Sequence, residues 1–281
     1  MQKISDKRCT IGEGPIWNDK DKLLYFVNSY ENEICTLDIK TGNVCTRKVD
    51  VGVAAIAFTK DYRMIVSRSD GVFILNDDDT TEKLYDTGKF SIENANDMKV
   101  GPDGRIYVGT ISEKRLGLSD KLDGKLYSID RTGNVKLLLA GLILSNGLEW
   151  SPDKKRFYHT DSDTARIREY DFDPESGDIS FTGRQVISSG ADGFTVDKNG
   201  YIYAASWGDY RINVIDTKSM EIVGCIEMPA KATASCGFAG EDMKTLVAVT
   251  ASFGVDIEKN PDAGFIFCKK LDTGGIKPYL F

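Results

Sequence analysis

Six positions, spaced 41 to 50 residues apart, hold most of the side chains with which this chain could do chemistry. They are, in order, Glu13, Ala54, Asn96, Asn146, Asp192 and Ser235. Five of the six carry oxygen and two are carboxylates. The sequence has one histidine, so a Ser-His-Asp triad or a multi-histidine zinc site would depend on His159 alone. Carboxylate and amide chemistry is therefore what we expect.

Each of these positions precedes a copy of the same pattern, in which two apolar segments flank a turn rich in Asp, Gly or Lys. The first apolar segments are residues 14–17, 55–58, 97–100, 147–150, 193–196 and 236–239. A third segment with alternating apolar residues follows in each unit, at residues 34–39, 72–75, 125–129, 166–170, 211–215 and 265–270. Most units add a fourth, such as residues 44–49 and 135–139.

Four strands in about 40 to 50 residues is the repeat of a β-propeller blade, and the periodicity of helical solenoids is missing. The sequence therefore predicts an all-β fold, a six-bladed β-propeller, as a single domain over residues 1–281. Residues 2–8 are expected to add an edge strand to the last blade, which would remove an exposed sheet edge.

The innermost strand of each blade lines the channel of a propeller, so the six positions should converge at one end of it. Carboxylates buried around one axis repel each other and lose hydration, and a cation would compensate both costs. Carboxylate and amide oxygens suit a hard ion such as Ca²⁺, Mg²⁺ or Mn²⁺. The alternative is that these polar residues line a column of water.

The connections between second and third strands should lie at the same end of the channel. Two are long, at residues 112–123 and 252–262, and could form a lid or a substrate wall. Trp207, Tyr210 and Phe253 could add apolar contacts there. The alternative is that both connections are solvated loops without a role.

Composition excludes several classes of partner. With 41% hydrophobic and 28% charged residues, the chain can bury a core without disulfides, and we expect its six cysteines to be free thiols. A formal charge of -7 argues against a nucleic-acid partner. No apolar stretch is long enough for a membrane span or a signal peptide, so a cytoplasmic monomer or weak homo-oligomer without a membrane partner is expected.

Five motifs together resemble the senescence marker protein, gluconolactonase and luciferin-regenerating enzyme family. They are Gly-Glu-Gly-Pro-Ile-Trp at 12–17, Asn-Asp-Met-Lys-Val at 96–100 followed by Gly-Thr at 109–110, Ser-Asn-Gly-Leu-Glu-Trp at 145–150, Asp-Gly-Phe-Thr-Val-Asp at 192–197 and Pro-Asp-Ala-Gly-Phe-Ile-Phe at 261–267. They resemble the family's motifs in order and spacing, and the similarity covers essentially the whole chain.

The resemblance implies roles for individual residues. Glu13, Asn146 and Asp192 match the family's metal ligands, and Asp192 also matches its catalytic acid/base. Asn96 matches a residue that contacts the substrate or metal-bound water. Asn94 stands where sugar-lactone members carry arginine, and Asp120 stands in place of a family glutamate in the blade-three loop, so both are predicted to contact substrate.

The resulting hypothesis is a hydrolase of small lactones that uses one divalent metal ion, with Ca²⁺ expected first and Mn²⁺, Mg²⁺ or Zn²⁺ as alternatives. The metal would polarise the lactone carbonyl, Asp192 would transfer the proton and Asn96 would help to hold the oxyanion. Two alternatives stay open. The same site could act on aryl esters, organophosphates or substrates of the oxidised-luciferin type, or it could bind calcium without relevant catalysis.

Overall fold

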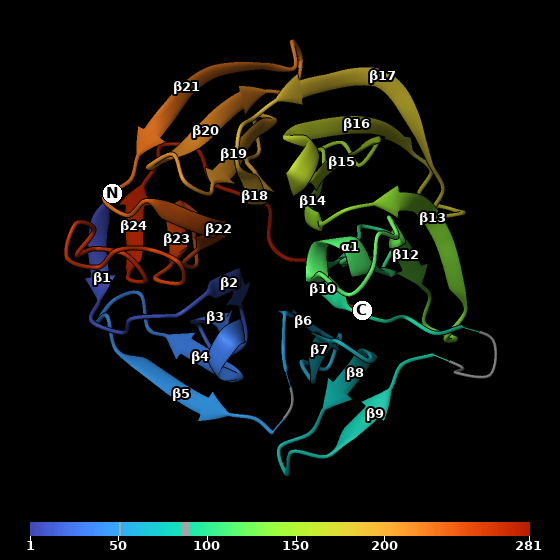
Figure 1. Ribbon diagram of the computed structural model, residues 1–281, viewed down its shortest axis with the longest axis horizontal. Helices are drawn as coiled ribbons and strands as arrows, with labels where there is room; N and C mark the ends of the chain where they lie inside the picture. Colours follow the sequence, from blue (N-terminus) through green and yellow to red (C-terminus); the bar gives the residue numbers. More distant parts are fainter. Residues whose placement is uncertain (51, 86–89) are drawn as a thin grey trace.

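The computed structural model describes residues 1–50, 52–85 and 90–281 and shows six four-stranded sheets arranged around a central axis (Figure 1). Neighbouring strands within each sheet are antiparallel. The predicted six-bladed β-propeller is therefore confirmed. Among the described residues, no helix has the length and apolar character needed to cross a membrane.

Each blade runs from an inner strand at the channel to an outer strand at the rim (Figure 1). The inner strands are β2 (Gly12–Asn18), β6 (Ala55–Phe58), β10 (Ala95–Val100), β14 (Ser145–Trp150), β18 (Ala191–Val196) and β22 (Ala232–Ala239). The second strands are β3 (Leu23–Asn28), β7 (Met64–Arg68), β11 (Ile106–Thr110), β15 (Arg156–Asp161), β19 (Tyr201–Ser206) and β23 (Thr245–Ala251).

The third strands are β4 (Glu33–Leu37), β8 (Gly71–Leu75), β12 (Gly124–Ile129), β16 (Arg166–Phe172), β20 (Arg211–Asp216) and β24 (Ile266–Lys270). The outer strands are β5 (Val44–Lys48), β9 (Thr81–Lys83), β13 (Val135–Leu142), β17 (Ile179–Ile187), β21 (Glu221–Glu227) and, in the last blade, β1 (Gln2–Ser5). Three short helices lie between second and third strands, namely η1 (Ser29–Glu31), α1 (Glu113–Leu116) and η2 (Ser162–Thr164).

Burial falls from the axis to the rim, which explains the sequence pattern of each strand. Every residue of β18 and β22 is buried, whereas six of the seven residues of β21 are exposed. Strands covered on both faces become continuously apolar, and strands facing water on one side alternate. Aromatic side chains fill the space between blades three and four, where the Trp150 ring centroid lies 4.8 Å from that of Tyr107 and 5.1 Å from that of Phe157.

The two ends of the chain complete the ring and cover one end of the channel. β1 pairs with β24, so the last blade combines both ends of the chain, and the predicted N-terminal edge strand is confirmed. The C-terminal segment then crosses the channel (Figure 1). Lys198 N donates to Gly274 O at 3.0 Å, and Phe281 N donates to Phe58 O at 3.0 Å. One segment therefore links blades five and two. That residues 1–281 form one domain stays a prediction.

Glycine allows neighbouring inner strands to pack closely. A Cβ atom at Gly193 in β18 would lie 2.6 Å from the Cβ of Ser235 and 3.0 Å from its Cα. At Gly147 in β14, which has φ +20°, a Cβ would lie 2.5 Å from Cε1 of Phe194. Real Cβ atoms do not approach other atoms so closely, so a larger residue would push adjacent blades apart.

We therefore expect Gly193→Ala to lower the free energy of unfolding by about 1–3 kcal/mol, the usual cost of overpacking a filled core. Chemical denaturation measures this change. Gly224→Ala on β21 is the matched control, because a Cβ there meets nothing within 4 Å. Equal effects of the two substitutions would contradict the close packing of β18 against β22.

Candidate metal and substrate site

A cavity of about 390 Å³ lies at one end of the channel, and five of the six repeat positions line it. These five are Glu13, Ala54, Asn96, Asn146 and Asp192. The structure thus brings together the three predicted metal ligands and Asn96. Ser235, the sixth position, lines a different cavity at the opposite end of the channel.

β-Bulges accompany the polar residues of the inner strands. The register of pairing shifts at or beside Glu13, Asn96, Asn146 and Asp192, whereas β6, which follows Ala54, pairs with β7 without a shift. In β22 the shift comes before Ser235, between Thr233 and Ser235. Because a bulge re-aims the side chains beside it, this different placement is consistent with Ser235 facing the other end.

Glu13 and Asp192 place two carboxyl groups around one axis. Burial, followed by the negative charges of Asp192 and Asp97, raises the pKa of Glu13 well above its usual value. Burial, followed by the negative charge of Asp97, also raises the pKa of Asp192 well above its usual value. Asp192 Oδ1 is buried and accepts no hydrogen bond from any residue that the structure describes. A buried carboxylate oxygen without a hydrogen-bond donor would be stabilised by a positively charged ligand such as a metal ion.

A hydrogen-bond chain orients Asn146. Its Nδ2 donates to Ser162 Oγ at 2.9 Å, and its Oδ1 accepts from Asn96 Nδ2 at 2.7 Å. A carbonyl oxygen has two lone pairs, so Asn146 Oδ1 keeps one for a cation. Two carboxylates and this amide oxygen are the donor set that a hard divalent ion prefers. The residues present therefore fit such an ion, although among residues 1–50, 52–85 and 90–281 no three His, Cys, Asp or Glu side chains cluster as ligands.

The oxyanion role expected of Asn96 is not supported by this arrangement. Besides its bond to Asn146, Asn96 Nδ2 donates to Ser145 O at 3.0 Å. Both amide hydrogens are therefore in use, and no donor is left for an oxyanion. The amide oxygen of Asn96 accepts no hydrogen bond within the described chain, so Asn96 can instead accept one from a substrate hydroxyl or a water molecule.

The two other predicted substrate residues lie outside this cavity. Asn94 has φ 54° and lines a neighbouring cavity of about 220 Å³, which shares Ile111 with the first. Asp120 is exposed on the blade-three loop and lines neither cavity. Their contacts with substrate stay predictions.

His159 takes no part in the site. It is fully buried, its Nε2 lies 2.8 Å from Ser145 Oγ, and burial lowers its pKa to about 3. A neutral imidazole without solvent access cannot meet a substrate. The expectation that catalysis uses carboxylates and amides rather than histidine agrees with this placement.

Loops between second and third strands add side chains that the repeat did not indicate. Arg115 from α1 and Asp163 from η2 line the cavity, with Arg115 Nε 3.4 Å from Asp163 Oδ1. Trp207 also lines it, as expected, whereas Tyr210, Phe253 and residues 252–262 do not. The 252–262 loop binds the N-terminal segment instead, through Ser252 N and Thr10 O at 3.1 Å. The length of the blade-three loop was the only sequence signal for Arg115.

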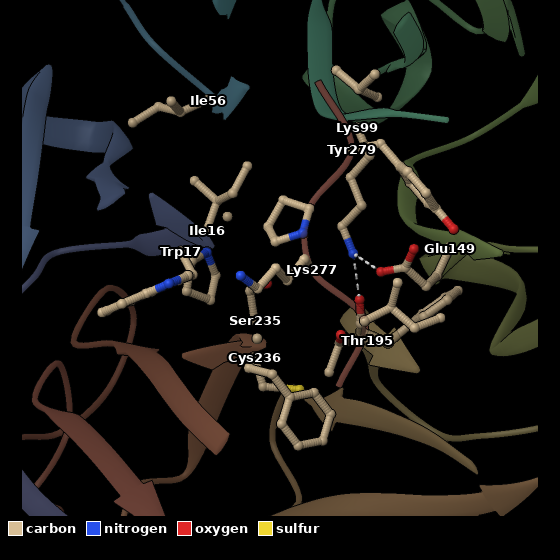
Figure 2. Close-up of a pocket in the computed structure, with 18 of the residues that line it drawn as sticks. Ile16, Trp17, Ile56, Lys99, Glu149, Thr195, Ser235, Cys236, Lys277 and Tyr279 are labelled. Atoms are coloured by element: carbon tan, nitrogen blue, oxygen red, sulfur yellow. Dashed lines mark hydrogen bonds and ion pairs between the residues drawn. The ribbon is translucent and has the colours of Figure 1, made fainter. Parts of the chain in front are cut away.

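The opposite end of the channel contains its own cation (Figure 2). Lys99 Nζ donates to Glu149 Oε2 at 2.9 Å and to Phe194 O at 2.8 Å. The C-terminal residues Lys277 and Tyr279 also line this cavity (Figure 2). The charge of Lys99 therefore balances carboxylates at the covered end, and in the described chain no comparable ion pair reaches Glu13 or Asp192.

The raised pKa values predict how the metal-free protein responds to pH. Because the folded pKa of Asp192 lies above its ordinary 3.8, the folded state binds more protons than the unfolded one, and stability falls as pH rises. In chelator, the melting temperature should be higher at pH 5.5 than at pH 8. Asp192→Asn should flatten this dependence, and a divalent ion should restore stability at pH 8. An unchanged slope in Asp192→Asn would contradict this source of the pH dependence.

Comparisons with known proteins agree with the fold and the motifs. Residues 11–252 match the family model described as the SMP-30/Gluconolactonase/LRE-like region. A Bacillus subtilis protein named "Putative sugar lactone lactonase YvrE" is 32% identical over 99% of this chain and 97% of its own length. Regucalcin of Gallus gallus is 29% identical over 100% of this chain and 98% of its own.

Two solved structures are similar throughout. A luciferin-regenerating enzyme has a TM-score of 0.88 and 26% identity, covering 99% of this chain and 98% of its own. A calcium-binding regucalcin from Agrobacterium tumefaciens also has a TM-score of 0.88, with 23% identity over 100% of this chain and 96% of its own. Together with the match of residues 11–252, the sequence relatives show that this chain belongs to the SMP-30/gluconolactonase/LRE-like family.

Proposed function

We propose that this protein is a divalent-metal-dependent hydrolase of small lactones. The observation that carries the proposal is the pair of carboxylates, Glu13 and Asp192, that face one cavity with a buried Asp192 oxygen lacking a hydrogen-bond partner in the described chain. A relative named as a sugar lactone lactonase, similar over nearly the whole chain, supports the choice of reaction.

Glu13, Asn146 and Asp192 would hold the metal, with Ca²⁺ first and Mn²⁺, Mg²⁺ or Zn²⁺ as alternatives. When bound, such an ion supplies a Lewis acid for the ester carbonyl. The positive charge also opposes the rise in the pKa of Asp192 that burial causes. In its ionised form, Asp192 can use a carboxylate oxygen that is not a ligand to take the proton from the attacking water and return it to the leaving oxygen.

The cavity supports a small-molecule substrate rather than a polymer. Its volume of about 390 Å³ lies within the range of small-ligand sites. Trp207, Leu144 and Ile11 form apolar walls around the polar centre. A lactone or a compact ester fits this combination, and no feature of the cavity favours organophosphates or luciferin-type substrates over a lactone.

A cytoplasmic location and a monomeric or weakly associated state remain our expectations.

The proposal predicts that Asp192→Ala reduces metal-dependent lactone hydrolysis by at least about 100-fold, the lower end of what a general base contributes. Turnover is measured on a panel of lactones and esters with Ca²⁺, Mn²⁺, Mg²⁺, Zn²⁺ or chelator, and circular dichroism checks the fold. Asp77→Ala is the control, because Asp77 is exposed on a turn at the rim. Undiminished turnover in Asp192→Ala would reject the assignment.

Calcium binding without relevant catalysis is the second candidate. It is favoured by the regucalcin relatives and by the similar Agrobacterium protein, which is described as a calcium-binding protein. The same panel separates the two candidates. Saturable hydrolysis that chelator removes supports the hydrolase, and calorimetric binding of Ca²⁺ without turnover of any substrate supports the second candidate.

A further inference from the structure

Arg115 is the one basic side chain that lines the site cavity in the described part of the chain. It is half-exposed, and its shortest distance to a carboxylate joins Nε to Asp163 Oδ1 at 3.4 Å. Its two terminal nitrogens donate no hydrogen bond to a described residue. The outer edge of the guanidinium is therefore available to a ligand in the cavity.

The loop around Arg115 is fixed by its own hydrogen bonds. Ser112 Oγ accepts from the backbone N of Arg115 at 3.2 Å and caps α1. Asp123 Oδ1 accepts from Glu113 N at 2.8 Å, and Lys114 N donates to Lys121 O at 3.1 Å. A donor held by an ordered loop loses less entropy when it binds a ligand.

Apart from the amide oxygen of Asn96 and the carboxylate of Asp163, the lining offers few hydrogen-bond partners to a substrate rich in hydroxyl groups. Ser162 Oγ accepts from Asn146 and donates to Ala191 O at 2.7 Å, so its hydrogen is in use. Ser29 Oγ points to Ile11 O at 3.5 Å. The apolar side chains that line the cavity are Ile11, Ala54, Ile111, Leu144, Ala191 and Trp207. Hydroxyl groups buried against such walls would lose their hydrogen bonds to water without replacement.

We propose that Arg115 is a specificity residue that selects lactones carrying one carboxylate and few hydroxyl groups. A guanidinium binds a carboxylate through two parallel hydrogen bonds, a geometry that lysine cannot provide. The charge of Arg115 comes from the blade-three loop, whereas the family resemblance implies an arginine at the position of Asn94, directly before β10. This inference rests on the proposed lactone hydrolysis at the same cavity.

The test compares a γ-butyrolactone bearing a carboxymethyl group with its neutral carboxamide analogue. Hydrolysis of the ring is followed for the metal-loaded wild type, Arg115→Gln, Arg115→Lys and Lys114→Gln. Lys114 is the matched control, because it lies on the same helix with the same charge and does not line the cavity. We expect Arg115→Gln to lower kcat/KM for the carboxylate by at least about 10-fold, mainly through KM, and to change the carboxamide less than about 2-fold.

Arg115→Lys should recover only part of this preference, and Lys114→Gln should change neither substrate. Equal losses on both lactones in Arg115→Gln would overturn the proposal, because Arg115 would then act through Asp192 or the fold. No loss on either lactone would overturn it as well.

Binding separates this inference from the proposed function. The matching lactam has a ring nitrogen in place of the ring oxygen of the lactone. Its amide bond resists hydrolysis, so titration calorimetry measures how tightly the lactam binds without turnover. Suppose that the wild type hydrolyses no lactone but binds the carboxylated lactam more tightly than its carboxamide analogue. If Arg115→Gln removes this difference in affinity, the proposed function fails, but carboxylate recognition by Arg115 stands. If the difference is absent in the wild type, the inference fails.

Discussion

The close approach of six inner strands around one axis is the constraint on which the rest of the structure depends. Gly147 and Gly193 have no Cβ because the next blade occupies that space. This packing also sets the electrostatics, since it limits the contact of Glu13 and Asp192 with water while bringing them to one cavity. The site therefore carries a cost in free energy that the surrounding blades offset through burial. Pairing of β1 with β24 joins the two ends of the chain in the last blade and closes the ring.

The two ends of the channel balance their negative charge differently. At the covered end, Lys99 lies against Glu149 and beside Asp97, so the chain supplies its own cation. At the open end, Glu13 and Asp192 have no such partner in the described chain. Arg115, the basic residue that lines this cavity, is half-exposed and lies against Asp163. This difference between the two ends supports the proposal that a bound metal ion would lie at the open end. The C-terminal segment, which crosses the other end, leaves this one accessible to a substrate.

The sequence predicted the blades and the inner positions because a repeat constrains both. Strand order, the N-terminal edge strand and the meeting of Glu13, Asn96, Asn146 and Asp192 all follow from the period. It did not predict the bulges, so Ser235 was expected at the wrong end of the channel. It also missed Arg115, because loops between second and third strands differ in length from blade to blade and no repeat indicates where their side chains point. Both misses concern local backbone geometry that hydrophobic periodicity does not encode.

This division between strands and loops has a chemical consequence. The groups proposed to hold the metal lie on inner strands, where packing on both sides fixes them, and Asn96 and Ser162 orient Asn146 by hydrogen bonds. Arg115 lies on a loop whose hydrogen bonds are mostly internal to residues 112–123, so its side chain can change without moving the inner strands. Binding sites on loops of a rigid scaffold vary in this way. In the proposed enzyme, the inner strands would therefore hold the reacting groups, and the loops would select the substrate.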